Sequence, residues 1–418
     1  MSVVGIIAEY NPFHFGHKYH LELSKKITNS EYSVAIMSGS FVQRGEPSLI
    51  DKWTKAKIAV ENGIDLVIEL PFIFSVQSAE LFAYGSIALL NSLKIVDYVS
   101  FGSEIGELEY LYPIADVLVK EPAHYKELLK KYLQNGNSYP VARSYALEDY
   151  FDKYDNRLNS QNINEIISAP NNILAIEYLK ALKRLNSNIK PITIKRIGSH
   201  YNDPKLNNKI ASATAIRNSL LESKNISIVQ DYIPKVTYDY LVDYLNNFSS
   251  FNSLDNYNQI IHYLLRVQDK KYLASIMDVE AGLDNRIVEK SYEYNDIEGF
   301  INSVVTKRYP RTRIQRILIH LMINLSKDTF KELSSHHPAY IRILGSNDKG
   351  FYLIKRIKQK TDIPIITKYS DHHSLKNPHI NRIINFDKRA TDLFFIGLNT
   401  KQPLTNMDYY ISPYIKKK

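Results

Sequence analysis

His14 and His17, with Gly16 between them, have the residue types and spacing best suited to phosphate chemistry in this chain. They follow the apolar run Val3–Ala8 and an Asn-Pro turn, and an amphipathic segment starts near His17. This order predicts a strand, a turn and a helix, with both histidines at the helix N-terminus. Backbone N–H groups and the helix dipole favour an anion at that position.

Imidazole N–H groups placed there can donate hydrogen bonds to a phosphoryl group under attack. When a nucleophile attacks the α-phosphorus of ATP, negative charge grows on the phosphoryl oxygens and on the departing pyrophosphate. Catalysis then rests on positioning and electrostatic stabilisation. Gly16 would let the nucleotide pack closely against the backbone. The alternative interpretation is a pair of capping or surface histidines.

A second candidate phosphate element lies within Ile210–Arg217. Ser212 is a good N-cap for a helix that carries Arg217, and these two residues with Thr214 could meet a triphosphate at that helix N-terminus. Ser and Thr caps are common, so this element is weak alone. It gains weight when paired with His14 and His17.

Three smaller signals lie between these elements. Gly102 ends a predicted strand and would let adenine or ribose approach the backbone, although an ordinary loop glycine fits equally well. Asn171 and Asn172 lie at a predicted helix start, where an asparagine is either a cap or a ligand contact, and the sequence does not decide which of the two would contact ATP. Arg196 follows a strand and could reach phosphate, although basic residues at strand ends are usually only solvated.

The elements that must position these residues alternate through the first 220 residues. Strands are predicted at Val3–Ala8, Ser33–Met37, Asp65–Leu70, Asp97–Phe101 and Pro191–Ile197. Helices are predicted at Lys18–Ile27, Leu49–Asn62, Ser75–Leu93, Tyr110–Leu133 and Asn172–Leu185. Such alternation with nearly continuous apolar strands favours an α/β fold with a parallel sheet covered on both faces. Right-handed crossovers would bring the loops after the strands to one edge of the sheet.

A polar stretch at 246–253 is predicted to be a linker or a long surface loop. Helical periodicity follows it, for example at Gln259–Val267, Arg313–Ile323 and Asp348–Gln359. We therefore predict two domains: an α/β catalytic domain at 1–225 and a mainly α-helical, basic domain at 226–418.

The composition is that of an ordinary globular protein, with 44% hydrophobic and 23% charged residues in 418. The net charge of +9 suits a polyanionic partner, although a lysine-rich proteome would also produce it. The absence of cysteine excludes disulfides and cysteine-based metal or nucleophile chemistry. Neither a basic signal-peptide start nor a membrane-length apolar segment is present, which predicts a cytoplasmic protein without membrane attachment.

Four motifs, in the same order along the chain, resemble the bacterial tRNA(Met) cytidine acetate ligase family of H-x-G-H nucleotidyltransferases. They are Glu9–His20, Met37–Pro47, Ala169–Leu174 and Ser212–Arg217. The long Gln43–Pro47 segment distinguishes this group from smaller H-x-G-H enzymes. The resemblance implies a Rossmann-like nucleotidyltransferase domain at the N-terminus.

The resemblance also implies an activity. ATP, accompanied by Mg²⁺, would convert acetate to acetyl-adenylate and pyrophosphate. The acetyl group would then pass to N4 of the wobble cytidine in elongator tRNA(Met). His14 and His17 would be catalytic, and no metal site on the protein is expected. The implied ATP contacts are Ile7, Ala8, Glu9, Tyr10, Asn11, Pro12, Phe13, His14, Phe15, Gly16, His17, Lys18, Tyr19, His20, Gly102, Asn171, Arg196, Ser212, Thr214 and Arg217.

A tRNA partner needs a basic surface, and Lys307–Arg316 holds five cations and no acid. The predicted tRNA contacts are Arg308, Arg311, Arg313 and Arg316. Arg313 and Arg316 would share one helix face and suit phosphate contact. A solvated charged face is the alternative.

Two other functions remain possible from the sequence. A small-molecule adenylyltransferase of cofactor biosynthesis would share both phosphate elements, although it usually needs only half this length. A nucleotide-binding or RNA-binding module without turnover is disfavoured because all the motif residues are intact.

Overall fold

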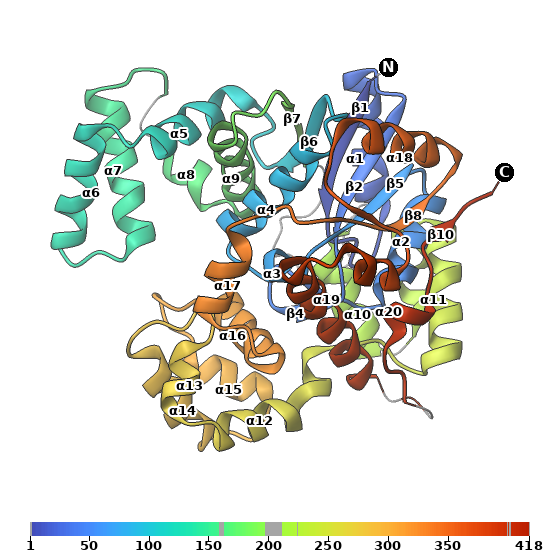
Figure 1. The fold of residues 1–418 in the computed structure, drawn as a ribbon. Helices are drawn as coiled ribbons and strands as arrows, with labels where there is room; N and C mark the ends of the chain where they lie inside the picture. Colours follow the sequence, from blue (N-terminus) through green and yellow to red (C-terminus); the bar gives the residue numbers. More distant parts are fainter. Residues whose placement is uncertain are drawn as a thin grey trace.

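A computed structural model describes residues 2–158, 163–196, 211–223, 225–398, 400 and 403–417. Its centre is an eight-stranded sheet in the order β10-β8-β5-β2-β1-β6-β7, with β9 paired to β8 (Figure 1). The strands are β1 (Val3–Ala8), β2 (Tyr32–Ser38), β5 (Leu66–Leu70), β6 (Tyr98–Ser103), β7 (Lys190–Lys195), β8 (Ile341–Ser346), β9 (Ile365–Ile366) and β10 (Tyr414–Ile415). Residues 197–210, which include the ends of two predicted elements at Ile197 and Ile210, lie outside the described residues.

Helices cover both faces of the sheet, which is the layered arrangement that the alternating sequence pattern predicts. α1 (Phe15–Thr28) and α2 (Lys52–Glu61) pack on one face, where Lys25 and Lys52 pair with Asp65 and Glu69 from the same side of β5. α4 (Ala79–Ser92), α9 (Pro170–Arg184) and α18 (Asp348–Lys360) pack on the other. The strands β2 and β5 are buried almost throughout, as strands covered on both sides must be.

Smaller elements link these layers and extend away from them. The linking elements are the hairpin of β3 (Phe41–Val42) and β4 (Glu46–Pro47), α3 (Phe72–Ser75) and α10 (Ala213–Ser223). The helices α5 (Leu108–Lys120), α6 (Ala123–Gln134), α7 (Tyr139–Lys153) and α8 (Ile163–Ser168) come between β6 and α9. Figure 1 shows α6 and α7 as a hairpin that projects from the rest of the molecule.

Most of the remaining chain is helical, as predicted. The helices are α11 (Lys235–Phe248), α12 (Asn258–Val267), α13 (Lys270–Ser275), α14 (Leu283–Ser291), α15 (Ile297–Val304), α16 (Arg311–Ile323), α17 (Lys327–Ser334), α19 (Pro378–Ile396) and α20 (Met407–Tyr410). Figure 1 shows α12 to α16 gathered into one group beside the sheet-containing part. None of the helices in the described ranges is both long and apolar enough to cross a bilayer.

Local capping explains where several helix predictions needed correction. The helix predicted at Leu49–Asn62 starts only at Lys52, because the Asp51 carboxylate accepts the N–H groups of Trp53 and Thr54 at 2.9 and 3.0 Å. The segment predicted as one helix at Tyr110–Leu133 forms two. Glu121 adopts a left-handed conformation with φ 43° and is followed by Pro122, which ends α5 before α6 begins.

The C-terminal half contributes strands that the sequence analysis missed. β8 pairs antiparallel with β5, so the sheet is mixed, and β9 and β10 each pair parallel with β8. The predicted α/β fold is confirmed, but residues of the C-terminal half complete its sheet. The division at residue 225 therefore stays a proposal about function, since both segments share one sheet.

A buried charge cluster joins the two halves. Lys52 Nζ lies 2.9 Å from Glu69 and 2.8 Å from Asp408, while Arg342 Nη2 lies 2.7 Å from Asp408. Lys52 is fully buried, so removing one partner would leave an uncompensated charge in the interior. Nearby, burial raises the pKa of Asp387 to about 7, and its carboxylate accepts the Phe72 N–H at 2.7 Å.

The predicted linker at 246–253 is neither a linker nor a surface loop. α11 continues to Phe248, and after the exposed Ser249 the chain enters the interior at Phe251 and Asn252. Asn252 is 2% exposed, donates its backbone N–H to Leu49 O at 3.1 Å, and donates its amide to Phe394 O at 2.8 Å. A polar composition misled the prediction because this side chain satisfies its hydrogen bonds inside the protein.

Candidate active site

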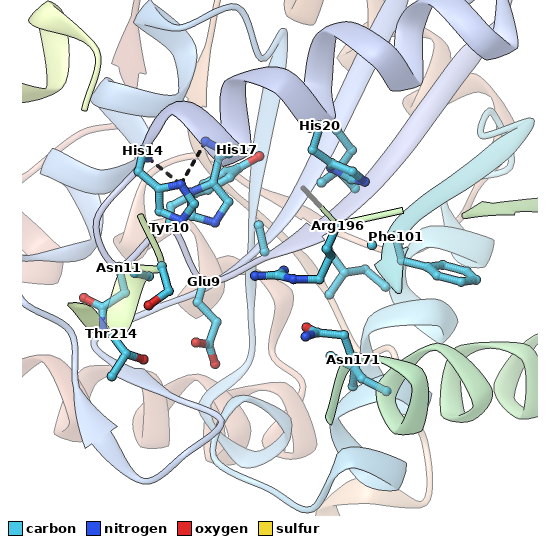
Figure 2. A pocket seen from close by; sticks show the side chains of 18 of the residues that line it. Glu9, Tyr10, Asn11, His14, His17, His20, Phe101, Asn171, Arg196 and Thr214 are labelled. Atoms are coloured by element: carbon cyan, nitrogen blue, oxygen red, sulfur yellow. Dashed lines mark hydrogen bonds between the residues drawn. The ribbon is translucent and has the colours of Figure 1, made fainter. Parts of the chain in front are cut away.

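A cavity of about 260 Å³ opens at the carboxyl ends of β1, β6 and β7, the edge predicted to carry the chemistry. Sixteen predicted ATP contacts line it: Ile7, Ala8, Glu9, Tyr10, Asn11, His14, Gly16, His17, Tyr19, His20, Gly102, Asn171, Arg196, Ser212, Thr214 and Arg217. Figure 2 shows His14 and His17 on one wall and Asn171 and Phe101 on the opposite one. Pro12, Phe13, Phe15 and Lys18 do not line the cavity.

The turn between β1 and α1 holds the two histidines in a fixed geometry. Tyr10 has φ 47°, a left-handed conformation that turns the chain directly after the strand and stores strain at this site. His14 caps α1, and its Nδ1 accepts the Gly16 N–H at 3.0 Å. His17 Nδ1 in turn accepts the His14 N–H at 3.2 Å. The two rings stack with centroids 3.8 Å apart.

These hydrogen bonds assign the tautomers. Because each Nδ1 accepts a backbone N–H, each neutral ring carries its proton on Nε2. Burial lowers the pKa of His14 to about 3, with Arg196 and Arg217 adding to the effect. Burial also lowers the pKa of His17 well below its usual value and that of His20 to about 4. The histidines are therefore neutral N–H donors at neutral pH.

These shifted histidines make stability depend on pH. Well above pH 6.5, these histidines are neutral in both the folded and the unfolded state. Burial lowers the pKa of His337 to about 4, as it lowers that of His14 to about 3. Below pH 6.5, both histidines are therefore protonated in the unfolded chain but stay neutral in the folded protein. The free energy of unfolding should fall by up to about 1.4 kcal/mol per pH unit for each such histidine.

Urea titrations at pH 8, 7, 6 and 5 would measure this dependence. His337 Nε2 lies 2.9 Å from Gly85 O, and His337 does not line the cavity, so His337→Gln removes one titrating ring and keeps every lining residue. This variant should show a shallower loss between pH 6 and 5 than the wild type. Equal slopes would contradict the burial-driven shift of His337.

The distal element meets the histidine turn directly. Ser212 Oγ accepts the Ala215 N–H at 3.1 Å, so Ser212 caps α10 as predicted. Arg217 donates to Asn11 O at 2.9 Å, although 206 positions separate them, and lies 3.3 Å from the Glu46 carboxylate. The two candidate phosphate elements therefore form one site.

The opposite wall is built on β6, β7 and α9. Arg196 follows β7, and its backbone N–H donates to Ser103 O at 3.0 Å. Burial lowers the pKa of this guanidinium. The Glu104 carboxylate accepts both the side-chain amide and the backbone N–H of Asn171, at 2.6 and 3.1 Å, and so points the Asn171 amide at the cavity.

The neighbouring asparagine has a different role. Asn172 is 3% exposed, and its Oδ1 accepts the N–H groups of Glu104 and Ile105 at 2.9 and 3.2 Å. Asn171 lines the cavity and Asn172 does not. The geometry thus favours Asn171 as the ligand contact and makes Asn172 a residue that holds the loop after β6.

Comparison with known proteins covers essentially the whole chain. A family model described as HIGH Nucleotidyl Transferase matches residues 1–408. The tRNA(Met) cytidine acetate ligase of Thermoanaerobacter sp. (strain X514) is 44% identical over 417 residues, which cover 100% of both chains. The protein of that name from Clostridium perfringens (strain ATCC 13124) is 42% identical over 99% of this chain and 100% of its own. This chain belongs to the tRNA(Met) cytidine acetate ligase family.

Solved structures of this family share the fold. A crystal structure of Thermotoga maritima TmcAL bound with alpha-thio ATP is 31% identical, with a TM-score of 0.93 and complete coverage of both chains. The apo form of that protein gives a TM-score of 0.95 at 32% identity. The predicted fold class is therefore confirmed by a family member, including its helical C-terminal part.

Sequence reasoning missed cavity residues outside the two phosphate elements of this tRNA(Met) cytidine acetate ligase family member. Gln43 and Arg44 line the cavity from the β3–β4 hairpin, and Phe82 and Tyr178 line it from α4 and α9. The length of the Gln43–Pro47 motif was a usable signal for the first two. Nothing in the local pattern distinguished Phe82 or Tyr178 from ordinary core residues.

A buried lysine that the sequence analysis did not consider holds the loops around the cavity. Lys55 Nζ lies 2.8 Å from both Ser38 O and Gly39 O, 2.7 Å from Ser48 Oγ and 3.2 Å from Glu9 O. Burial lowers its pKa to about 7. Lys55 therefore ties the ends of β1 and β2 to the hairpin loop.

The four predicted tRNA contacts differ in accessibility. Arg316 is 7% exposed and binds Asp278 at 2.7 Å, and Arg313 donates to Asp278 O at 2.7 Å. Both guanidiniums thus stabilise the packing of α16, so their predicted role at an open face needs correction. Arg308 and Arg311 are exposed and pair with Glu280 and Glu298.

Proposed function

We propose that this protein activates acetate with ATP and transfers the acetyl group to N4 of the wobble cytidine of elongator tRNA(Met). The observation that carries the proposal is the convergence of His14, His17 and Arg217 on one cavity. The chain is also similar from end to end to tRNA(Met) cytidine acetate ligases, whereas a small-molecule adenylyltransferase would not need the basic C-terminal half. A tRNA substrate would place the enzyme in the cytoplasm.

In the first step an acetate oxygen attacks the α-phosphorus of ATP, and pyrophosphate leaves. The Nε2–H groups of His14 and His17 donate to phosphoryl oxygens as their negative charge grows. Arg217 and the capped N-terminus of α10 bind the β- and γ-phosphates. Adenine or ribose lies against Gly102, Asn171 and Arg196. The two histidines need not change protonation, which suits their lowered pKa values.

Mg²⁺ is proposed to enter with ATP. Across the described residues no group of three or more His, Cys, Asp or Glu side chains is arranged to hold a metal ion. Phosphate oxygens and water would then supply most ligands of the ion, as is common for nucleotide-bound Mg²⁺. The ion would supply charge neutralisation on the leaving pyrophosphate.

The tRNA is proposed to contact residues 226–418, while residues 1–225 supply the ATP site. Arg308 and Arg311 are the retained candidates among the four arginines, because their side chains are 67% and 40% exposed. The Tyr309 ring lies 5.4 Å from Arg308 but is only 9% exposed, so it offers no open face for base stacking.

Replacing both Arg308 and Arg311 with alanine should weaken tRNA(Met) binding and flatten its salt dependence. Two fewer phosphate contacts lower the slope of log affinity against log salt by about 1.4 to 1.8. Filter binding at several salt concentrations measures this slope. Arg382→Ala is the matched control, because Arg382 is 48% exposed and is also paired with a glutamate, Glu332. If the double variant and the control had equal slopes of log affinity against log salt, the tRNA would have to bind at a different surface.

The proposed activity is tested by incubating the protein with ATP, labelled acetate and elongator tRNA(Met), followed by nucleoside analysis. The expected product is labelled N4-acetylcytidine together with AMP and pyrophosphate. A tRNA(Met) whose wobble cytidine is replaced by uridine should stay unlabelled. Folded protein that exchanges pyrophosphate with ATP but never labels tRNA would refute the proposed acceptor.

A further inference from the structure

The cavity contains one carboxylate among its lining residues in the described chain, that of Glu9. The other charged side chains that line it are the cations Arg44, Lys195, Arg196 and Arg217. Figure 2 shows Glu9 extending between Thr214 on one side and Arg196 and Asn171 on the other. A negative charge at this place repels the triphosphate that the cations attract, so it needs a reason other than ATP binding.

Hydrogen bonds fix the position of Glu9 in the cavity. Glu9 directly precedes Tyr10, whose left-handed backbone turns the chain out of β1. Its Oε1 accepts the Gln43 N–H at 2.8 Å, and Lys55 donates to its backbone carbonyl at 3.2 Å. Within the described part of the chain, Oε2 has no hydrogen-bond partner. One oxygen is thus anchored while the other is available to a ligand.

The chemistry of this position matches the amine of cytidine. The N4 amino group is a hydrogen-bond donor, and Glu and Asp are the side chains that accept from it. Two aromatic side chains, Phe82 and Tyr178, line the same cavity, and each is 3% exposed. Burial raises the pKa of the Tyr178 hydroxyl, and the Glu9 charge adds to this effect.

We propose that Glu9 is the catalytic residue that binds the N4 amine of the wobble cytidine and accepts its proton during acetyl transfer. This inference rests on the proposed function and names the base for its second step. The N4 lone pair attacks the acetyl carbonyl carbon and forms the C–N bond. The bond from that carbon to the phosphate oxygen breaks, and AMP leaves with the electron pair. The proton lost from N4 passes to Glu9 and then to water.

Groups from three other elements surround Glu9. Arg44 approaches from the hairpin, Lys55 from α2 and Tyr178 from α9, in addition to the Gln43 N–H. The adenylation step does not use the Glu9 carboxylate, so the two steps can be separated by experiment.

The test uses Glu9→Gln, whose amide oxygen still accepts the Gln43 N–H and keeps the loop in place. Acetate-dependent ATP–pyrophosphate exchange and trapping of acetyl-adenylate by hydroxylamine report the first step. Single-turnover labelling of tRNA(Met) from preformed acetyl-adenylate reports the second. Glu22→Gln, an exposed carboxylate on α1, is the isosteric control.

We expect Glu9→Gln to slow acetyl transfer about 10²–10⁴-fold more than it slows exchange, the range typical of a general base. A parallel loss in both steps, or a raised Mg²⁺ requirement for exchange, would overturn the proposal and make Glu9 an ATP or metal contact. Transfer at the wild-type rate would overturn it as well. A wild-type enzyme that forms acetyl-adenylate but no N4-acetylcytidine would instead refute the proposed function, and with it this role.

Discussion

His17→Ala is expected to lower the rate of acetate-dependent ATP–pyrophosphate exchange by about 10²–10³-fold, the loss typical of removing one donor to a developing oxyanion. The imidazole also accepts the His14 N–H through Nδ1, so alanine removes a support of the second histidine. The affinity for tRNA(Met) should stay within about twofold of the wild type, because the proposed tRNA contacts belong to residues 226–418.

Two further variants separate the parts of this effect. His17→Asn keeps a donor and an acceptor at the same helix position and should recover part of the lost rate. His124→Ala removes an exposed histidine that stacks on Tyr154 in the α6–α7 hairpin and should leave exchange unaltered. If His17→Ala exchanged pyrophosphate at the wild-type rate, the phosphoryl-stabilising role of this ring would be wrong.

Gly45→Ala is expected to destabilise the protein by roughly 3 kcal/mol or more, because two costs act together. Gly45 has φ +77°, which costs a residue with a Cβ about 1–2 kcal/mol. A Cβ there would also lie 2.2 Å from the Arg316 backbone nitrogen, so the β3–β4 hairpin must move off α16. Since Glu46 of this hairpin pairs with Arg217, ATP binding should weaken too.

Gly136→Ala is the matched control, since Gly136 has φ +81° with no atom within 4 Å of the added Cβ. It carries the conformational cost alone and should lose only about 1–2 kcal/mol. Urea denaturation of both variants measures the difference. Equal losses would show that the hairpin can shift away from α16 without cost.

The strand–turn–helix unit and the cap at Ser212 were predictable because local rules decide them. Apolar runs, an Asn-Pro turn and a serine before a helix each act over a few residues, and the structure confirms these elements. The edge of the sheet where the chemistry gathers was predictable for the same reason, since parallel strands and right-handed crossovers share one geometry.

The rest depended on contacts distant in sequence. The strand β8 carries a charged residue, Arg342, whose burial is possible only beside Asp408 and Glu69. Arg316 was predicted to contact tRNA, but its guanidinium is buried and pairs with Asp278. Asn252 looked like a linker residue, yet its hydrogen bonds reach Phe394. No local window of sequence contains these partners.

The position of β8 between β5 and β10 in the sheet also affects how the protein folds during synthesis. Asp65 and Asn347, bonded beside this strand pair at 3.0 Å, are 282 positions apart in the chain. At ribosomal speeds of roughly 5–20 residues per second, β8 is synthesised on the order of 15–60 s after β5, so the β5 edge stays unpaired for that time. An apolar strand left unpaired for that long is a template for aggregation. The nascent N-terminal half therefore carries an unpaired β5 edge until β8 is made, and a shortened chain ending before residue 341 would leave this edge unpaired.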